Sequence, residues 1–336
     1  MALNWKGRRV LVTGAAGFVG ANLCRVLLDQ GADLYGLDLV TDSPSLRVLD
    51  VKIPLWAADV ADPVQVRGLL KDLISPEVVF HLAGKSHIAA SQRDPLGAWE
   101  ASVRGTWSVL EACRSSKQIR AVVCASSNHV YGDMANLYGW GPSGKITAFT
   151  EGMSLDQVDV YGTSKQIVDS LVRCYGKSLN FPVASLRHVN AFGPADPHQS
   201  HLVTGTICDL LDGKSPIIRG DGTATKGYLS IRNVVAAYLQ VAQELALAHG
   251  VEWGSTWNAG PPEPISVLSL VNLIIKISGR EVRPVLQGSD LSQNNYLEHL
   301  DSTRIRSLGW NPDPLSDGLR EAFIWYEQHS GLKWLL

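Results

Sequence analysis

The first half of the chain alternates short apolar runs with longer segments whose apolar residues recur at helical spacing. The runs that we predict as strands cover residues 8–13, 34–37, 55–58, 78–82, 121–126 and 183–186. The segments that we predict as helices cover residues 18–30, 63–73, 95–114 and 160–179. Strands that alternate with helices of this length form a parallel sheet with helices on both faces. The sequence therefore predicts a doubly wound α/β fold.

Beyond about residue 187 this alternation breaks up, and Pro and Gly become frequent. Helical patterns at 203–211, 231–248, 267–278 and 315–329 are separated by short strand-like runs. No linker rich in Ser or Gly and no tandem repeat divides the chain. We therefore predict a first domain at 1–187 and a smaller C-terminal lobe at 188–336, with some segments of the second half returning to the first domain.

Composition limits the partners of the chain. Thirty basic residues against 32 acidic residues give a formal charge of −2, which leaves no excess of positive charge for a nucleic acid backbone. No apolar run approaches the ~20 residues that span a bilayer, and the first ten residues lack the apolar stretch of a signal peptide. The five cysteines are scattered without a CxxC pair, and no cluster has metal-ligand spacing. We predict a cytoplasmic protein with no metal, no nucleic acid partner and no membrane contact.

A glycine-rich turn joins the first predicted strand to the first predicted helix. Its glycines allow a tight turn and let the backbone approach a pyrophosphate, while the helix N-terminus supplies free N–H groups. The alternative is a plain strand–helix turn, but the strand before it and the helix after it favour a dinucleotide site. We therefore predict a Rossmann-type domain. The residues expected to contact the cofactor here are Gly14, Ala16, Gly17, Phe18, Val19 and Gly20.

Two acidic residues follow the next two strands. Asp38 closes the second strand, where a carboxylate accepts hydrogen bonds from the adenosine ribose and repels a 2′-phosphate. This position favours NAD over NADP, although an aspartate here can also cap a turn. Asp59 and Val60 follow the third strand and are candidates for the adenine edge.

Tyr161 and Lys165 lie four residues apart in a predicted helix and so share one face of it. An ammonium near a phenol stabilises the phenolate, so we expect Lys165 to lower the pKa of Tyr161 from its usual ~10. Tyr161 is then a candidate general base or acid for a sugar hydroxyl. The alternative for such a pair is a surface contact, and the dinucleotide turn upstream favours the catalytic interpretation.

Several motifs together resemble the extended short-chain dehydrogenase/reductase family, which includes nucleotide-sugar epimerases and dehydratases. They are the glycine turn, Asp38, residues 81–84 (HLAG), residues 126–132 (SSNHVYG), and Tyr161 with Lys165. Residues 186–194, 218–222, 300–302 and 308–312 fit the same family, so the resemblance covers nearly the whole chain. The second half is most similar to CDP-glucose 4,6-dehydratases.

This resemblance implies that a tightly held NAD oxidises a nucleotide sugar at C4 to a transient ketone, after which hydride returns. Tyr161 would be the base, Lys165 its pKa-lowering and ribose-holding partner, and Ser127 would hydrogen-bond the C4 oxygen. The residues implied to line the cofactor are Leu82, Ala83 and Gly84. The residues implied to bind the diphosphate and nucleotide are Asn190, Arg219 and Lys226. The resemblance also implies a homodimer.

The chain departs from the dehydratase pattern at Asn128 and His129, where 4,6-dehydratases typically carry an acid followed by Glu or Lys. An amide has no useful pKa, so Asn128 is not a proton donor. His129 is either an acid or base near neutral pH or a neutral hydrogen bonder. Small, non-acidic residues here resemble UDP-galactose 4-epimerases, so we predict an epimerase, with a 4,6-dehydratase as the alternative. A sugar dehydrogenase, suggested by a similar segment in uronate dehydrogenases, and a non-catalytic NAD-binding protein remain further alternatives.

One of these substrate residues departs from the family pattern, and two more side chains are candidates for the substrate site. Lys226 replaces the usual arginine, which keeps the positive charge but loses the bidentate fork. Lys85 is able to contact an acidic or phosphorylated group, or else is simply solvated. His87 lies near the predicted cleft, where it is either a substrate contact or a structural histidine.

Overall fold

A computed structural model describes residues 3–132, 148–247, 251–288 and 298–330 of the chain. Its centre is a sheet of seven parallel strands in the order β11-β6-β5-β4-β1-β2-β3. The strands are β1 (Arg9–Thr13), β2 (Asp33–Asp38), β3 (Leu55–Ala57), β4 (Val78–His81), β5 (Ala121–Ala125), β6 (Val183–His188) and β11 (Ser255–Ala259). All six runs predicted as strands are present, and the α/β fold is confirmed.

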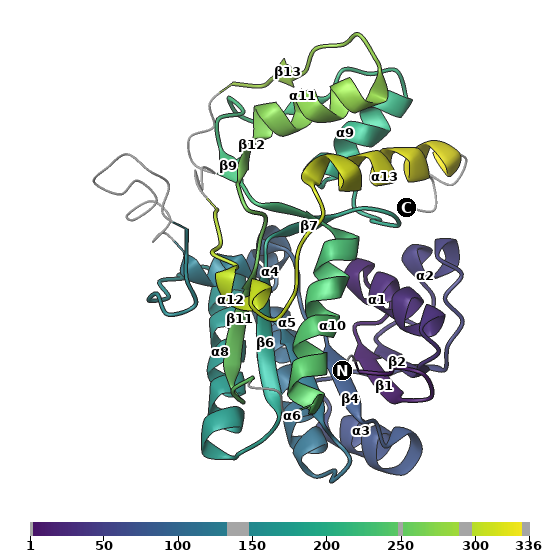
Figure 1. Ribbon diagram of the computed structural model, residues 1–336, viewed down its shortest axis with the longest axis vertical. Coiled ribbons are helices and arrows are strands. Elements are labelled where there is room, and N and C mark those ends of the chain that lie inside the picture. Colours follow the sequence, from purple (N-terminus) through teal and green to yellow (C-terminus); the bar gives the residue numbers. More distant parts are fainter. Residues whose placement is uncertain (1–2, 133–147, 248–250, 289–297, 331–336) are drawn as a thin grey trace.

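Helices cover both faces of this sheet (Figure 1). The helices are α1 (Phe18–Asp29) and α10 (Ile231–Leu247) on one face, and α3 (Pro63–Gly68), α6 (Gly105–Arg114) and α8 (Val160–Ser178) on the other. Val10 and Val12 of β1 pack with the first group, and Leu11 between them packs with the second. Because both faces are buried, the strands appear in the sequence as continuous apolar runs.

The predicted helices are present, but two of them contain π-helical turns. Segment 63–73 consists of α3 and a π-helix, η1 (Leu69–Ile74). Segment 95–114 consists of α5 (Pro95–Ala98), a second π-helix, η2 (Trp99–Arg104), and α6. A π-turn adds one residue to the hydrogen-bonded loop, a change too small to alter the spacing of apolar residues visibly. The short helices α2 (Pro44–Val48) and α4 (Ile88–Arg93) were not predicted.

A second hydrophobic core lies at the upper end of Figure 1, away from the sheet. It is built by α9 (Leu202–Leu211), α11 (Val267–Ser278) and α13 (Leu315–Gln328). The remaining elements are the strand pairs β7 (Asn190–Phe192) with β10 (Tyr228–Ser230), β9 (Thr225–Lys226) with β12 (Ile265–Ser266) and β8 (Ile217–Ile218) with β13 (Val285–Leu286), and the helix α12 (Thr303–Arg306). Among the described helices, none combines the length and the apolar character needed to cross a bilayer.

Two elements after residue 187 pack with the first half of the chain. β11 extends the sheet beside β6, and α10 packs against β5, β6 and α1. These two elements of the second half therefore contribute to the sheet and to one of its faces. The exact domain division at residue 187 stays a prediction.

The strand order reverses between β1 and β4. β2 and β3 lie beyond β1, whereas β5 and β6 lie beyond β4. Parallel sheets bind ligands outside the carboxyl ends of their strands at such a reversal. The two strand ends are joined there, because the Leu82 N–H donates to the Thr13 carbonyl over 3.0 Å. The glycine turn after β1 therefore lies at the carboxyl ends of β1 and β4, where a ligand is expected; we call this place the crevice.

Candidate active site

The glycine turn fits closely against the end of β4. Gly14 has a φ of +74°, and its N–H donates to the Leu37 carbonyl over 2.8 Å. A Cβ at Gly14 would lie 2.7 Å from the Ala83 nitrogen, closer than a side chain tolerates. The N-cap of α1 is Gly17, and no side chain caps the helix. The first turn of α1 therefore keeps N–H groups for a ligand, as a pyrophosphate site requires.

We predict that Gly14→Ala weakens NAD binding by about tenfold or more, because an L-residue at positive φ costs about 1–2 kcal/mol and the new methyl displaces the end of β4. The measurement is NAD affinity by calorimetry. Gly7→Ala is the matched control, since Gly7 also has a positive φ (+70°) but open space around its Cβ position. NAD binding by Gly14→Ala as tight as that of Gly7→Ala would contradict the assignment of this turn.

The Asp38 carboxylate lies beside the glycine turn. One oxygen accepts from the Ala16 N–H at 2.9 Å and the other from the Leu39 N–H at 2.7 Å. Asp38 therefore holds the turn in place as well as standing where the ribose is expected. Asp59 is exposed and caps a turn by accepting from the Ala61 N–H at 2.9 Å, while its neighbour Val60 is buried.

Beneath the crevice, His81 at the end of β4 is fully buried. Its Nδ1 lies 2.7 Å from the Thr13 hydroxyl and its Nε2 lies 3.0 Å from the Thr106 hydroxyl. Burial, and next the charge of Lys165, lower the pKa of His81 to about 3. The neutral imidazole of His81 therefore links β1 to α6 through these two contacts. The HLAG motif thus contributes a structural histidine, followed by Leu82, Ala83 and Gly84 at the mouth of the crevice.

Ser127, Tyr161 and Lys165 come together at the carboxyl end of β5. All three are buried, with exposed fractions of 5%, 9% and 5%. The Tyr161 side chain is hydrogen-bonded to Ser127. Lys165 follows one turn along α8 and donates to the Ala125 carbonyl over 3.0 Å. The structure therefore brings together the three residues that the sequence singled out.

The predicted direction of the Tyr161 pKa shift is wrong for the chain as it stands. Burial raises the pKa of Tyr161, the hydrogen bond with Ser127 opposes this, and the charges of Asp159 and Glu298 raise it further. Burial also lowers the pKa of Lys165 to about 8, against the opposing charge of Asp169. The phenol therefore holds its proton at neutral pH.

Asn128 and His129 form the short 3₁₀-helix η3 (Asn128–Tyr131), which Ser127 caps by accepting from the His129 N–H at 3.1 Å. The His129 ring meets the Tyr161 ring edge-on, with centroids 5.8 Å apart. The Asn128 amide oxygen lies 3.4 Å from the Ser127 hydroxyl. His129 therefore lies beside Tyr161, and Asn128 lies beside Ser127.

Glu298 belongs to this site and was missed by the sequence analysis. Its buried carboxylate accepts from the amides of Asn128 and Asn190, each at 3.1 Å, and from the Lys226 ammonium at 3.0 Å. Burial raises the pKa of Glu298, but Lys226, His129 and the Asn190 hydrogen bond outweigh it and keep the pKa below its usual value. The only sequence sign was an acid close to the Leu-Asp motif at 300–301.

The other predicted substrate residues lie away from Tyr161 or are otherwise paired. Lys85 forms a half-exposed ion pair with Asp94, at 3.6 Å, which agrees with the solvated interpretation. His87 contacts the rings of His198 and His201, with centroids 4.8 and 5.2 Å apart. Arg219 follows β8 and is exposed. Throughout the described ranges, His, Cys, Asp and Glu form no group of three able to hold a metal.

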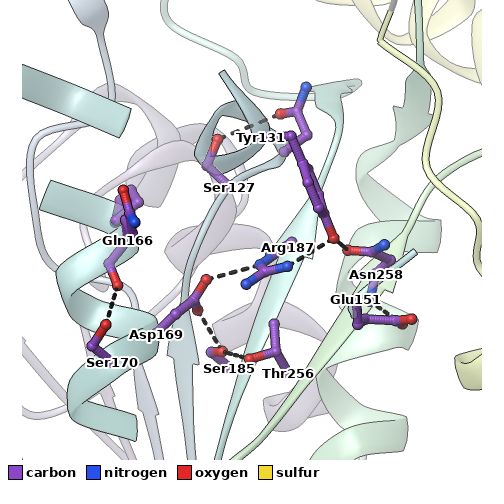
Figure 2. A network of polar contacts seen from close by, with 12 residues as sticks. Ser127, Tyr131, Glu151, Gln166, Asp169, Ser170, Ser185, Arg187, Thr256 and Asn258 are labelled. Carbon is purple, nitrogen blue, oxygen red and sulfur yellow. Dashed lines mark hydrogen bonds and ion pairs between the residues drawn. The ribbon is translucent and has the colours of Figure 1, made fainter. Parts of the chain in front are cut away.

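A buried polar network links α8 to the neighbouring strands (Figure 2). Asp169, one turn beyond Lys165, accepts from Arg187 of β6 at 2.8 Å and from the Ser185 hydroxyl at 2.6 Å. Arg187 also donates to the Tyr131 hydroxyl over 2.7 Å. Tyr131 in turn donates to the Asn258 side chain of β11 over 2.9 Å. The network ties α8 to η3 and to two strands of the sheet.

Comparison with known proteins agrees with this geometry. The model of the "NAD dependent epimerase/dehydratase family" matches residues 10–260. The chain belongs to this family. The family description confirms NAD as the cofactor and confirms the predicted resemblance.

Relatives of this family member have different activities. A UDP-glucose 4-epimerase of Mycolicibacterium smegmatis is 29% identical, over 96% of this chain and 99% of its own length. A CDP-glucose 4,6-dehydratase of Salmonella typhimurium is 25% identical, over 92% of this chain and 87% of its own length. The chain spans about half the length of the trifunctional dehydratase/epimerase/reductases among its curated relatives. Epimerases and dehydratases, the first two of the activities that the sequence left open, are thus both represented.

A solved structure gives the same fold. The dTDP-glucose 4,6-dehydratase DesIV of Streptomyces venezuelae, solved as a double mutant with NAD bound, matches with a TM-score of 0.81 and 25% identity. The match covers 98% of this chain and all of that one. The fold of an epimerase/dehydratase, with its parallel sheet, is therefore shown over both halves.

The crevice of this epimerase/dehydratase fits NAD. The uncapped N-terminus of α1 and the close approach of Gly14 to Ala83 form the cradle that a pyrophosphate needs, which a Cβ would fill. Asp38 lies at the end of β2, and the Lys165 ammonium lies 3.6 Å from the position that a Cβ of Gly84 would take. Bound NAD would supply a hydride acceptor.

Proposed function

We propose that the protein is a nucleotide-sugar 4-epimerase that oxidises the sugar at C4 and reduces it again from the other face. The observation that carries this proposal is the buried Ser127–Tyr161 pair with Asn128 beside it. A 4,6-dehydratase must also protonate a departing C6 hydroxyl. The Asn128 amide is too weak an acid for that step, and Glu298 is held as a carboxylate by three donors, so it does not supply the proton.

In the proposed reaction Tyr161 moves the proton of the C4 hydroxyl and Ser127 hydrogen-bonds the C4 oxygen. Oxidation requires the phenolate, which the positive charge of NAD and of Lys165 favours. On the return step the ketone oxygen needs a proton, and a buried phenol with a raised pKa is suited to supply it. One residue therefore serves both directions, and no second acid is required.

A 4,6-dehydratase is the second candidate, favoured by the position of His129. Its ring lies 5.8 Å from the Tyr161 ring, measured between centroids, and so stands beside the place of the reacting sugar. A protonated imidazole is able to donate to a departing hydroxyl. In this case His129 would replace the acid that dehydratases carry at the preceding position.

The test is mass spectrometry of UDP-, CDP-, GDP- and dTDP-hexoses incubated with the protein and NAD in deuterated water. We expect one sugar to change isomer at unchanged mass, because hydride returns to the carbon that lost it. Loss of water would instead establish a dehydratase and assign the acid role to His129. Deuterium in the isomerised sugar would move the inversion to a carbon beside the ketone.

We further propose that the protein is a homodimer, with α6 and α8 at the interface. Leu96 of α5 and Trp107 of α6 are exposed apolar side chains, with 71% and 43% exposure. Burying such side chains favours association. Light scattering should give twice the chain mass, and Trp107→Glu should return the mass to that of one chain. The cytoplasmic location stays a prediction.

A further inference from the structure

Glu298 is a buried acid that the proposed reaction does not use. Its exposed fraction is 8%, and its two oxygens are held by three donors from separate parts of the chain. Asn128 comes from η3, Asn190 from β7 and Lys226 from β9. The Glu298 N–H also donates to the Thr225 carbonyl over 2.9 Å. The carboxylate is therefore fixed in place, with its negative charge directed at the Asn128 side of the site.

This carboxylate lies within electrostatic reach of the reacting centre. It bonds to Asn128, whose amide oxygen contacts Ser127, which in turn is bonded to Tyr161. Its charge helps to raise the pKa of Tyr161. The Glu298 carboxylate would therefore repel an anionic group on a sugar held by Tyr161, as it repels the phenolate form of Tyr161.

Lys226 offsets this repulsion only in part, because it pairs with Oε1 of Glu298 whereas Oε2 is the oxygen that bonds to Asn128. Its ammonium already pairs with Glu298 at 3.0 Å, and its side chain is only 27% exposed. A second carboxylate beside this pair would have to share one cation with Glu298, which leaves a buried charge without a full partner. A sugar hydroxyl brings no second charge into the site, and it donates a hydrogen bond to the carboxylate.

We propose that Glu298 is a specificity-determining residue: its fixed carboxylate excludes sugars that carry a carboxylate and restricts the site to nucleotide sugars with an uncharged hexose. The inference rests on the proposed function, since it places a nucleotide sugar at Tyr161. The discrimination between charged and uncharged sugars then comes from repulsion by Glu298 and not from an additional attractive contact.

The experiment compares two ligands that differ only at C6. Affinities of UDP-glucose and UDP-glucuronate are measured by calorimetry with the NAD-loaded protein, and then those of the CDP, GDP and dTDP pairs. The nucleotide and diphosphate are common to each pair, so their contributions cancel in the ratio. We expect the wild type to prefer the glucose compound by about tenfold or more, because like charges in a buried site repel strongly. Glu298→Gln should reduce that ratio by about tenfold.

Two variants control for other effects. Glu298→Asp keeps the charge and should keep the preference, whereas Glu263→Gln removes an exposed carboxylate and should change nothing. An unchanged ratio in Glu298→Gln, or a wild-type preference for the glucuronate, would overturn the role of Glu298 alone. Binding of neither member of any pair, with NAD binding intact, would overturn the proposed function and this inference with it.

Discussion

The Tyr161→Phe variant should lose turnover by about 10³-fold while it still binds NAD and the sugar nucleotide. Removing a positioned proton-transfer group typically costs 10²–10⁴-fold in rate, and here the same phenol is assigned to both half-reactions. The ring itself remains, so its edge-on contact with His129 and its burial are preserved. The measurement is single-turnover conversion of the sugar identified by mass spectrometry, with NAD affinity determined in parallel.

Ser127→Ala is the companion variant. Ser127 both bonds Tyr161 and caps η3, so its loss should reduce turnover less than the loss of the phenol and should also raise the apparent pKa of Tyr161. Turnover in Tyr161→Phe within a few-fold of the wild type would contradict the assignment of Tyr161. Loss of NAD binding in that variant would show instead that the hydroxyl serves the cofactor.

The Arg187→Met variant should lose about 3–5 kcal/mol of unfolding free energy, the usual effect of removing one partner from a buried ion pair. Asp169 and Arg187 have exposed side-chain fractions of only 6% and 4%, and their atoms lie 2.8 Å apart. Without the guanidinium, the Asp169 carboxylate keeps only its bond from Ser185. The Tyr131 hydroxyl loses its donor as well. The measurement is the urea unfolding transition followed by circular dichroism.

The double variant Asp169→Leu/Arg187→Met separates the charge effect from a packing effect. If the uncompensated carboxylate causes the loss, the double variant should be more stable than Arg187→Met alone. Arg114, which forms an exposed ion pair with Glu111 on α6, provides the control, and Arg114→Met should change stability by less than about 1 kcal/mol. Equal losses in the Arg187 and Arg114 variants would contradict the structural role of the buried pair.

The sheet and its long helices were predictable because their causes are local. Strands buried on both faces must be apolar throughout, and the helix at Phe18–Asp29 shows its buried residues at regular spacing. Gly14 was predictable for a similar reason, since a positive φ and a close approach to β4 both require a residue without a Cβ. The π-turns were not predictable, because one extra backbone residue hardly shifts an apolar pattern.

The parts of the site that escaped prediction depend on contacts between distant residues. Glu298 and Asn128 are 170 residues apart in sequence, and the Asp169–Arg187 pair joins a helix to a strand by side-chain direction alone. The direction of the Tyr161 pKa shift was wrong for the same reason. The four-residue spacing to Lys165 is visible in the sequence, whereas the burial of the phenol and the bond from Lys165 to Ala125 are not.

The most direct test of C4 oxidation and return uses the sugar nucleotide carrying deuterium at C4. The label leaves as hydride in the first half-reaction and comes back in the second, so its final position reports what happened to the ketone. The 4-epimerase account predicts an inverted sugar with the deuterium still at C4, as determined by nuclear magnetic resonance. Deuterium at C6 of a dehydrated sugar would contradict it and establish the dehydratase. With excess unlabelled reduced cofactor present, the account predicts that the deuterium still returns to C4, because a tightly held cofactor does not exchange between the two half-reactions. Loss of the label from the inverted sugar under these conditions would contradict it.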